Sequence, residues 1–240
     1  EFGPRLSLAN TGAVRKAISL TDPARFHAAT REPYFAGLAA DQGTIAHAEL
    51  GYLYKTMAET YESADRINAH YRLRESAASY PKTELGRAFR DIATFIANGM
   101  GTRVYYASAT GFDTHNNQVA RQARALGTVA DALAAFVKDM KAQGLLDDTL
   151  VMVFSEFGRR VKANASNGTD HGTAGSMWLL GSKGRGVFND VPSLTDLDAN
   201  GDVGSSVDFR SVYASLLEQW LGVPANEVLP SSIRPVEGLI

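Results

Sequence analysis

Apolar residues recur with helical spacing in three long stretches of the chain: 45–78, 83–100 and 118–143. In the third stretch they follow the i, i+3, i+4, i+7 pattern of an amphipathic helix, and Gly144 is a natural end for it. Pro81 falls between the first two stretches, where it would interrupt a continuous helix. We therefore expect three helices in these regions.

Three shorter stretches have the composition of β-strands. Residues 102–108 are rich in β-branched and aromatic side chains, whereas 149–154 and 176–180 are apolar runs of the kind found in buried strands. The helix expected over 118–143 lies between the first two strands, so the order predicts a β-α-β unit with parallel strands and a right-handed crossover. A further amphipathic helix is expected over 208–221.

This order of elements predicts a single α/β domain over residues 1–240, with a mainly parallel sheet flanked by helices. Residues 1–43 are rich in proline, glycine and short polar stretches, which predicts an irregular lead-in. Residues 44–100 form a helical segment. Residues 101–221 form the α/β segment that carries most of the reactive side chains.

Composition narrows the possible functions. With 24 basic and 26 acidic residues, the formal charge is −2, which gives no broad positive surface for nucleic acid or an anionic membrane. No apolar window is long enough to span a bilayer, and the first residues lack the layout of an export signal. Cysteine is absent, so histidine, aspartate and glutamate are the available metal ligands.

The first candidate ligands follow the strand predicted over 102–108. In Gly-Phe-Asp-Thr-His at 111–115, Asp113 and His115 are two residues apart. On an extended backbone both side chains therefore point the same way, while Thr114 faces elsewhere. Such a pair can clamp one metal ion. In the alternative interpretation Asp113 caps the following helix and His115 is a polar surface residue.

A second group of candidates directly follows the strand predicted over 149–154, in Ser-Glu-Phe-Gly-Arg-Arg at 155–160. Glu156 is expected at the carboxyl edge of the sheet, where open α/β sheets bind ligands. A buried carboxylate there needs a positive partner, which Arg159, Arg160 or a metal ion can supply. Alternatively, Glu156 and Arg159 form a structural ion pair.

The third group is Gly-Thr-Asp-His-Gly at 168–172. Asp170 and His171 are adjacent, so both can face one ion only in a turn, which the flanking glycines permit. His171 is the better ligand candidate, and Asp170 either ligates as well or orients an imidazole from the second shell of the site. A plain polar turn is the alternative, since Asn167-Gly168 is a common turn pair.

Other motifs are set aside. Ser155 ends a predicted strand, but it lacks the Gly-x-Ser-x-Gly surroundings of a nucleophile elbow, and an aspartate adjacent to His171 would give poor triad geometry. Residues 196–202 match the start of a calcium loop, but the twelfth position is Val207 instead of glutamate, so we expect a solvated turn. No role is assigned to the histidines without nearby ligand types, which are His27, His47 and His70.

Together with Val-Asp-Phe-Arg-Ser-Val-Tyr at 207–213, the three groups resemble the bacterial DUF1501 family in sequence and spacing, from about residue 80 to residue 221. That family is similar to the alkaline phosphatase and sulfatase superfamily, whose α/β core holds one or two metal ions at the carboxyl ends of a mainly parallel sheet. The resemblance implies that Asp113, His115 and His171 bind one metal. It also implies that Glu156 takes the position of a metal-binding aspartate.

The chain departs from this pattern in two places. The residue after Glu156 is Phe157, where the superfamily motif has histidine, which implies one metal or a weakly bound second metal. The family's first strand, with its Gly-Gly-Asn-Asp-Gly-like motif and the superfamily's nucleophile, does not occur here, and the chain begins at Glu1 without methionine. The resemblance therefore implies a C-terminal half that is incomplete for catalysis, with the N-terminal segment of the same gene product as its partner. Full-length relatives often carry an export signal, which implies a periplasmic or secreted protein.

These expectations combine into a metal-dependent hydrolase of phosphate or sulfate esters. Arg159 or Arg160 would bind a small anionic ester next to the metal. Two imidazoles suit zinc or manganese better than calcium. The alternative is a secreted binding or structural protein that keeps the fold and catalyses nothing. The metal ligands expected here are Asp113, His115, Glu156 and His171.

Overall fold

The computed structural model describes residues 1–12, 17–34, 37, 48–181 and 184–240. Contacts within the chain divide it into two compact units. Unit 1 comprises residues 1–110 and 126–143, and unit 2 comprises residues 111–125 and 144–240. Every candidate ligand from the sequence belongs to unit 2. The assignment of one domain to residues 1–240 stays a prediction.

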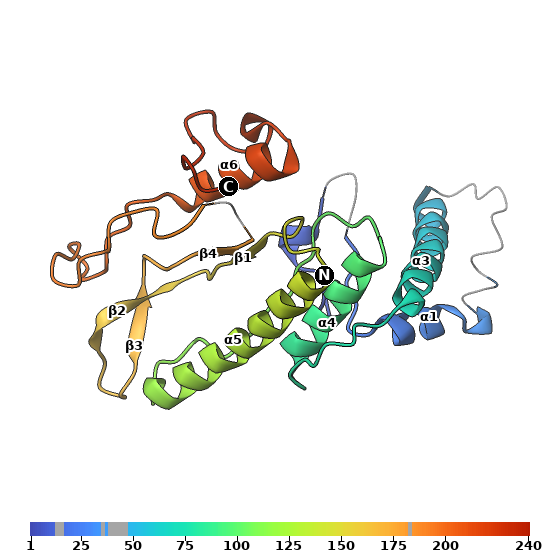
Figure 1. Cartoon of the computed structure of the whole chain (residues 1–240), viewed down its shortest axis with the longest axis horizontal. Helices are drawn as coiled ribbons and strands as arrows, with labels where there is room; N and C mark the ends of the chain where they lie inside the picture. Colours follow the sequence, from blue (N-terminus) through green and yellow to red (C-terminus); the bar gives the residue numbers. More distant parts are fainter. Residues whose placement is uncertain (13–16, 35–36, 38–47, 182–183) are drawn as a thin grey trace. The chain divides into compact units, whose positions relative to one another are not determined.

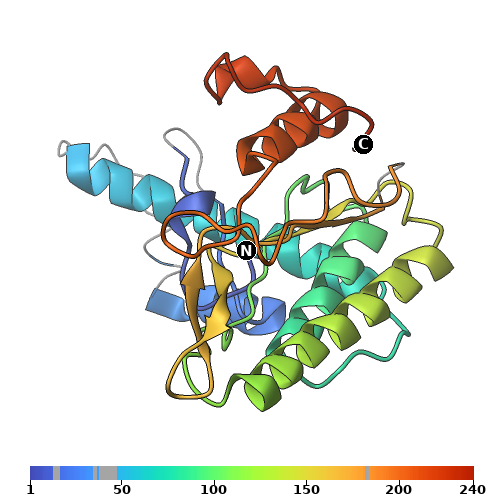
Figure 2. The same ribbon diagram turned by 90° about the vertical axis from the view of Figure 1, so that its left-hand side faces the viewer.

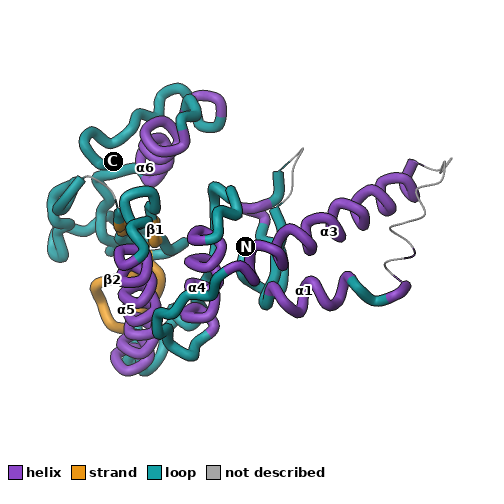
Figure 3. Tube along the Cα trace, turned by 45° about the vertical axis from the view of Figure 1, so that its right-hand side comes forward, coloured by secondary structure: helices purple, strands orange, loops and turns teal. Residues whose placement is uncertain are grey.

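Unit 1 is mainly helical (Figures 1 and 3). Asp22 caps the first α-helix, where its carboxylate accepts hydrogen bonds from the backbone amides of Ala24 and Arg25. Thr83 caps α4 (Glu84–Ala97) in the same way, because its side-chain oxygen accepts a hydrogen bond from the amide of Gly86. The elements of this unit are η1 (Leu8–Asn10), α1 (Pro23–Thr30), α3 (Ala48–Leu73), α4 (Glu84–Ala97) and most of α5 (Gln118–Ala142).

The helices α3, α4 and α5 confirm the periodic stretches at 45–78, 83–100 and 118–143. Residues 45–47, at the start of the first stretch, lie outside the described residues, as does His47. The prediction of irregular structure over 1–43 is wrong at α1. Asp22 followed by proline is a strong signal for the start of a helix, and the high glycine and proline content of the region obscured it.

The core of unit 1 forms where α3 and α4 meet the N-terminal strand-like residues. Leu20, Ile67 and Phe95 are buried there, and several partly buried aromatic rings pack against them. Phe89 of α4 and Phe136 of α5 add a second contact, with ring centroids 5.2 Å apart. Burial of such side chains stabilises the fold by about 25 cal/mol for each Å² removed from water.

The strand predicted over 102–108 is wrong. Ala107 makes an isolated parallel bridge to Phe2, and the Phe2 amide donates to the carbonyl of Tyr106 at 2.8 Å. Phe2 also bridges Leu20. Residues 102–108 therefore pair with the N-terminus at one residue only and form no continuous ladder of backbone hydrogen bonds. β-branched composition alone does not make a strand without a continuous partner.

Unit 2 contains two small antiparallel sheets (Figure 2). In the first, β1 (Val151–Val153) pairs with β4 (Trp178–Leu180), which confirms the apolar runs at 149–154 and 176–180 as strands. In the second, β2 (Gly158–Ala163) pairs with β3 (Thr169–Gly172). The described chain is therefore mixed α/β. The parallel β-α-β unit expected around α5 is not formed among the described residues, because the run at 102–108 has no ladder and β1 pairs with an opposite strand.

The C-terminal part of unit 2 is helical and confirms the helix predicted over 208–221. Asp208 caps α6 (Phe209–Ser215), which continues into a π-helical segment, η2 (Leu216–Leu221). Gly222 ends this segment with a φ of 66°, and the short η3 (Ala225–Glu227) follows. In the part of the chain that the structure describes, no helix combines the length and the apolar character needed to cross a membrane.

Candidate metal centre

The β2–β3 hairpin forms the base of the candidate site. Arg159 and His171 are directly opposite each other in its register, so their side chains lie on the same face. Asn164 closes the turn, because its side-chain oxygen accepts hydrogen bonds from the amides of Ser166 and Gly168 at 2.9 and 3.0 Å. The turn itself contains Asn167 with a φ of 57°, a conformation that asparagine tolerates.

The segment that carries Asp113 and His115 docks on this hairpin through its backbone. The amides of Asn117 and Gln118 donate to carbonyls of the hairpin turn, at 3.1 and 2.9 Å, which satisfies two amides at the start of α5. The side-chain amide of Asn164 donates to the carbonyl of His115 at 2.9 Å. These contacts fix the loop before α5 against the hairpin.

Gly168 makes this close approach possible. It is buried, and a Cβ atom added there would lie 2.3 Å from the carbonyl carbon and oxygen of His115. Side chains larger than hydrogen would push the two segments apart. The glycine of the Gly-Thr-Asp-His-Gly motif therefore sets the distance between His115 and β3.

The side chains of residues 113–115 alternate as the sequence predicts. Thr114 is fully buried, and its hydroxyl lies 3.1 Å from the side-chain oxygen of Gln122 on α5. Asp113 and His115 point the other way and meet, with 2.7 Å between Asp113 Oδ1 and His115 Nδ1. The extended spacing of the Asp-x-His motif thus brings its two polar groups together.

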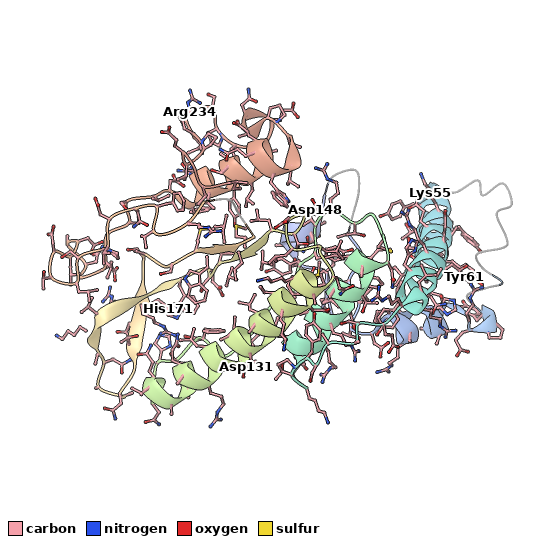
Figure 4. All side chains as sticks on the ribbon, viewed as in Figure 1. Lys55, Tyr61, Asp131, Asp148, His171 and Arg234 are labelled. Carbon is pink, nitrogen blue, oxygen red and sulfur yellow. The ribbon has the colours of Figure 1, made fainter. Side chains whose placement is uncertain are left out.

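His171 joins this pair from β3. Its Nε2 lies 2.8 Å from the same Asp113 oxygen, and Figure 4 labels it on the hairpin. One ligand-type atom from each of Asp113, His115 and His171 lies within 4.8 Å of the others, and this is the one such group among the described residues. Both imidazole rings are roughly half exposed, at 45% and 44% of the side chain, so the group is open to solvent.

The three donors fit a borderline divalent cation. A tetrahedral ion with bonds of about 2.0–2.1 Å separates its ligand atoms by about 3.3–3.4 Å. The two carboxylate–imidazole separations, 2.7 and 2.8 Å, are shorter than this. The limit of 4.8 Å, within which all three ligand atoms lie from one another, is longer. Because these side chains are exposed, modest rotations can equalise the separations, and two nitrogens with one oxygen suit zinc or manganese.

The surroundings keep Asp113 ionised. The hydrogen bond from His171 is the main cause that lowers the pKa of the Asp113 carboxyl below its usual range. Its desolvation acts in the opposite direction, and the nearby charges of His115, His171 and Arg159 lower the pKa further. A carboxylate that stays charged is the form that binds a cation.

Phe157 and Arg159 support the His171 side of the group. The Phe157 ring stacks on the imidazole of His171, and the Arg159 guanidinium lies 5.1 Å from the Phe157 centroid. Arg159 donates to the carbonyls of Phe112 and Thr169, the latter at 2.7 Å, and its side chain is 17% exposed. Arg159 therefore ties the loop before Asp113 to β3, and it lies 3.9 Å from the Asp113 carboxylate.

Glu156 does not join the group of three. Glu156 lies in a bend between β1 and β2 and is exposed. It is not among the residues whose ligand atoms lie within 4.8 Å of one another, so the structure brings together three of the four expected ligands at that distance. A role for Glu156 as a metal ligand or a bridge between metals stays a prediction.

Asp170 lies on the other side of β3 from His171. Asp170 and His171 are consecutive residues of β3, so their side chains face opposite ways and the turn that would let both face one ion is not formed. The Asp170 carboxylate accepts a hydrogen bond from Asn164 at 3.3 Å. Since Asn164 also binds the carbonyl of His115, Asp170 supports the site indirectly instead of contacting an imidazole.

Arg160 and the calcium-like stretch 196–202 form one structural contact. Arg160 Nε donates to the carboxylate of the buried Asp202 at 3.0 Å. Asp198 accepts hydrogen bonds from the amides of Asn200 and Asp202, which closes a tight turn. The stretch 196–202 therefore forms a turn, as expected from the missing glutamate. It is not fully solvated, because Asp202 is buried against Arg160.

Two supporting residues escaped the sequence analysis. From the sequence, Phe157 is recognisable only as the residue that stands in place of a histidine, and no pattern assigns Asn164 a role in the site. The phenylalanine one residue before β2 could have been recognised as facing the same way as Arg159. Nothing in the sequence identifies the partner of Asn164, because that contact spans 49 residues.

The comparison with protein-family models agrees with the motifs. The chain belongs to the DUF1501 family, described as a protein of unknown function, and the family model matches residues 35–229. No curated protein and no solved structure matches the chain. The family match covers both the hairpin and the Asp-x-His loop, but its description names no activity.

Proposed function

We propose that this DUF1501 protein is a metal-dependent hydrolase of phosphate or sulfate esters, with the metal held by Asp113, His115 and His171. The observation that carries the proposal is the convergence of one carboxylate and two imidazoles from segments 58 residues apart. Exposed acidic groups are common without a metal, but a preorganised pair of imidazoles on one carboxylate is the arrangement that borderline cations need. We infer zinc or manganese ahead of calcium.

The residues of the site have separate tasks in this proposal. Asp113 supplies the charged ligand, and His115 and His171 supply neutral ring nitrogens. Phe157 holds the plane of His171, and Arg159 holds the loop that presents Asp113. A divalent ion bound there would act as a Lewis acid toward an ester oxygen. No nucleophile is assigned among the described residues.

Kinship with the alkaline phosphatase and sulfatase superfamily is part of the proposal. The motif resemblance supports this kinship, whereas the two sheets of the described residues are antiparallel and do not contribute to it. The same resemblance supports a periplasmic or secreted location. A role for Glu156 as a further ligand rests on the motif resemblance alone, because its side chain is exposed and outside the group of three.

A non-catalytic binding or structural role is the second candidate function. The position of Phe157 favours it, because a phenyl ring stacked on His171 occupies the place where the superfamily motif has a second histidine. The site then offers one ion three protein ligands. Such a protein would bind a metal for stability or recognition without ester turnover.

Ester hydrolysis and metal content separate these two functions. The protein is loaded with zinc or manganese, and release of p-nitrophenol from its phosphate and sulfate esters is followed with and without a chelator. Turnover that requires the metal and disappears in His171→Ala supports the hydrolase and would place the nucleophile within these residues. Metal binding without turnover of either ester fits the non-catalytic role and also a hydrolase site that is incomplete for catalysis. Absence of metal binding removes the hydrolase and leaves the non-catalytic role.

A further inference from the structure

A cleft in unit 1 combines an apolar lining with one charged side chain. The cleft has a volume of about 240 Å³, and every described residue that lines it belongs to unit 1. Ile67 of α3 is buried in the core of this unit, and Ile18 and Met100 pack against the same core. These three residues form the apolar part of the lining. The other lining residues are Ser63, Arg66, Gly101 and Thr102.

The guanidinium of Arg66 lies at this cleft. Its Nη2 donates to the carbonyl oxygen of Met100 at 3.3 Å, and it would lie 3.8 Å from a Cβ atom added at Gly101. Met100 and Gly101 both line the cleft, so the charged end of Arg66 lies there and not only its aliphatic part. Gly101 has a φ of 73°, which favours glycine, and it places no side chain against the guanidinium.

The charge of Arg66 has no carboxylate partner in the part of the chain that the structure describes. No aspartate or glutamate oxygen there lies within 4.0 Å of its guanidinium. The neighbouring Asp65 contacts His27 and Arg31 instead. A guanidinium carries several N–H donors, and the contact with Met100 uses only one of them. An anion can therefore bind to Arg66 without displacing an ion pair.

The volume of the cleft limits the ligand to a small molecule. Sites for drug-sized ligands enclose about 300–1,000 Å³, which is more than this cleft offers. A water molecule occupies about 30 Å³ of the liquid, so the cleft has room for about eight groups of that size. A short aliphatic chain with one polar head group fits this space.

The chemistry of the lining favours a carboxylate as that head group. The planar guanidinium matches the two oxygens of a carboxylate, and the Ser63 hydroxyl is a further hydrogen-bond donor. A phosphate monoester carries up to about two negative charges, whereas Arg66 is the single charged residue in the described lining. The apolar residues remove an aliphatic tail from water, which is favourable.

We propose that this cleft binds a short-chain aliphatic monocarboxylate, with the carboxylate on Arg66 and the tail against the apolar part of the lining. The site is independent of the proposed metal centre, whose three ligands belong to unit 2. It gives unit 1 a ligand of its own.

NMR titration with hexanoate tests the proposal, because a small ligand that binds weakly shifts the signals of the groups that it contacts. The methionine methyl groups are labelled with carbon-13, and the signal of Met100 is identified by its loss in Met100→Leu. Acetate supplies the charge without the tail, and 1-hexanol supplies the tail without the charge. The variants are Arg66→Gln, Ser63→Leu, which fills the cleft, and the control Arg74→Gln. Arg74 is also an exposed arginine of unit 1, but it does not line the cleft.

We expect hexanoate to shift the Met100 methyl signal saturably, and acetate and 1-hexanol to bind more weakly. Arg66→Gln should weaken hexanoate binding by about 5-fold or more, because it removes charge-assisted hydrogen bonds. The same variant should bind 1-hexanol as the unmodified protein does. Ser63→Leu should abolish the binding of both ligands, and Arg74→Gln should change neither.

No saturable shift of the Met100 signal, or equal hexanoate affinity in Arg66→Gln and Arg74→Gln, would overturn the proposal. Equal affinity of the unmodified protein for hexanoate and 1-hexanol would do the same, because the carboxylate would then contribute nothing. Unfolding temperatures are measured for every variant. If Arg66→Gln does not fold, the comparison of the three ligands on the unmodified protein still decides whether the carboxylate is recognised.

Discussion

The ring of Phe157 lies flat against the imidazole of His171, with 3.8 Å between the ring centroids and 5° between the ring planes. This stack limits rotation of the imidazole and leaves its Nε2 beside Asp113. Position 157 therefore acts on the candidate metal centre without offering a ligand.

Replacement of Phe157 by alanine should weaken metal binding. The imidazole of His171 gains rotational freedom, and changes around a ligand commonly reduce affinity by about 10-fold or more. Competition with a chromophoric zinc chelator measures the effect. Phe154→Ala is the control, because Phe154 is an exposed aromatic residue that contacts Tyr213. Equal zinc affinity in the two variants would contradict a role for the stack.

Arg159→Lys should destabilise the loop that presents Asp113. Lysine keeps the charge, but its single ammonium lacks the planar fork that reaches the carbonyls of both Phe112 and Thr169. An unsatisfied buried acceptor lowers the free energy of unfolding by about 1–3 kcal/mol. Urea denaturation measures this loss, and zinc affinity should fall with it. A lysine variant with unchanged stability and zinc affinity would show that the two carbonyl contacts are dispensable.

Gly168→Ala should separate the hairpin from the loop before α5. The added Cβ would lie 2.3 Å from the His115 carbonyl oxygen, and such overpacking commonly lowers the free energy of unfolding by about 1–3 kcal/mol. Gly127→Ala is the matched control, since no atom lies within 4 Å of its added Cβ and alanine favours the α5 helix. Thermal unfolding and zinc affinity should decrease in the first variant only. Similar behaviour of the two variants would argue against the close contact.

Asp208 should make the stability of unit 2 depend on acid pH. Its hydrogen bonds with the Arg210 side chain and amide lower the pKa of its carboxyl. A lowered pKa in the folded protein means that the stabilisation is present above the unfolded value of about 3.9 and is lost as pH falls through the folded value. Asp208→Asn should remove this part of the acid dependence, measured as unfolding temperature between about pH 2 and 5. A variant with the same pH profile as the unmodified protein would contradict this assignment.

The helices were predictable from the sequence because their signals are local. The apolar stripe and the Thr83 cap define α4, and the periodicity of residues 118–143 defines α5 almost to its ends. The Asp-x-His pair was also predictable, because two residues on an extended chain share a face whatever the fold.

Strand pairing was harder to predict because partners are distant and few. Residues 102–108 have strand composition but meet only Phe2, whereas the polar β2 forms a hairpin with β3. The same limit applies to Glu156, which lies in a bend between β1 and β2 that no sequence pattern predicts. The contacts of Arg159 with Phe112 and of Asn164 with His115 join residues 47 and 49 positions apart, beyond any local pattern.

Metal content of the purified protein tests the central claim most directly. Elemental analysis after loading with zinc or manganese, followed by removal of free metal, compares the unmodified protein, His171→Ala and the control His70→Ala. His70 is also a partly exposed histidine, but its Nδ1 lies 2.8 Å from the carbonyl oxygen of Arg66, outside the group of three. We predict about one equivalent of metal in the unmodified protein and in His70→Ala, and a loss of affinity of about 10-fold or more in His171→Ala. Full metal retention by His171→Ala, or no metal bound by the unmodified protein, would contradict the assignment of this centre.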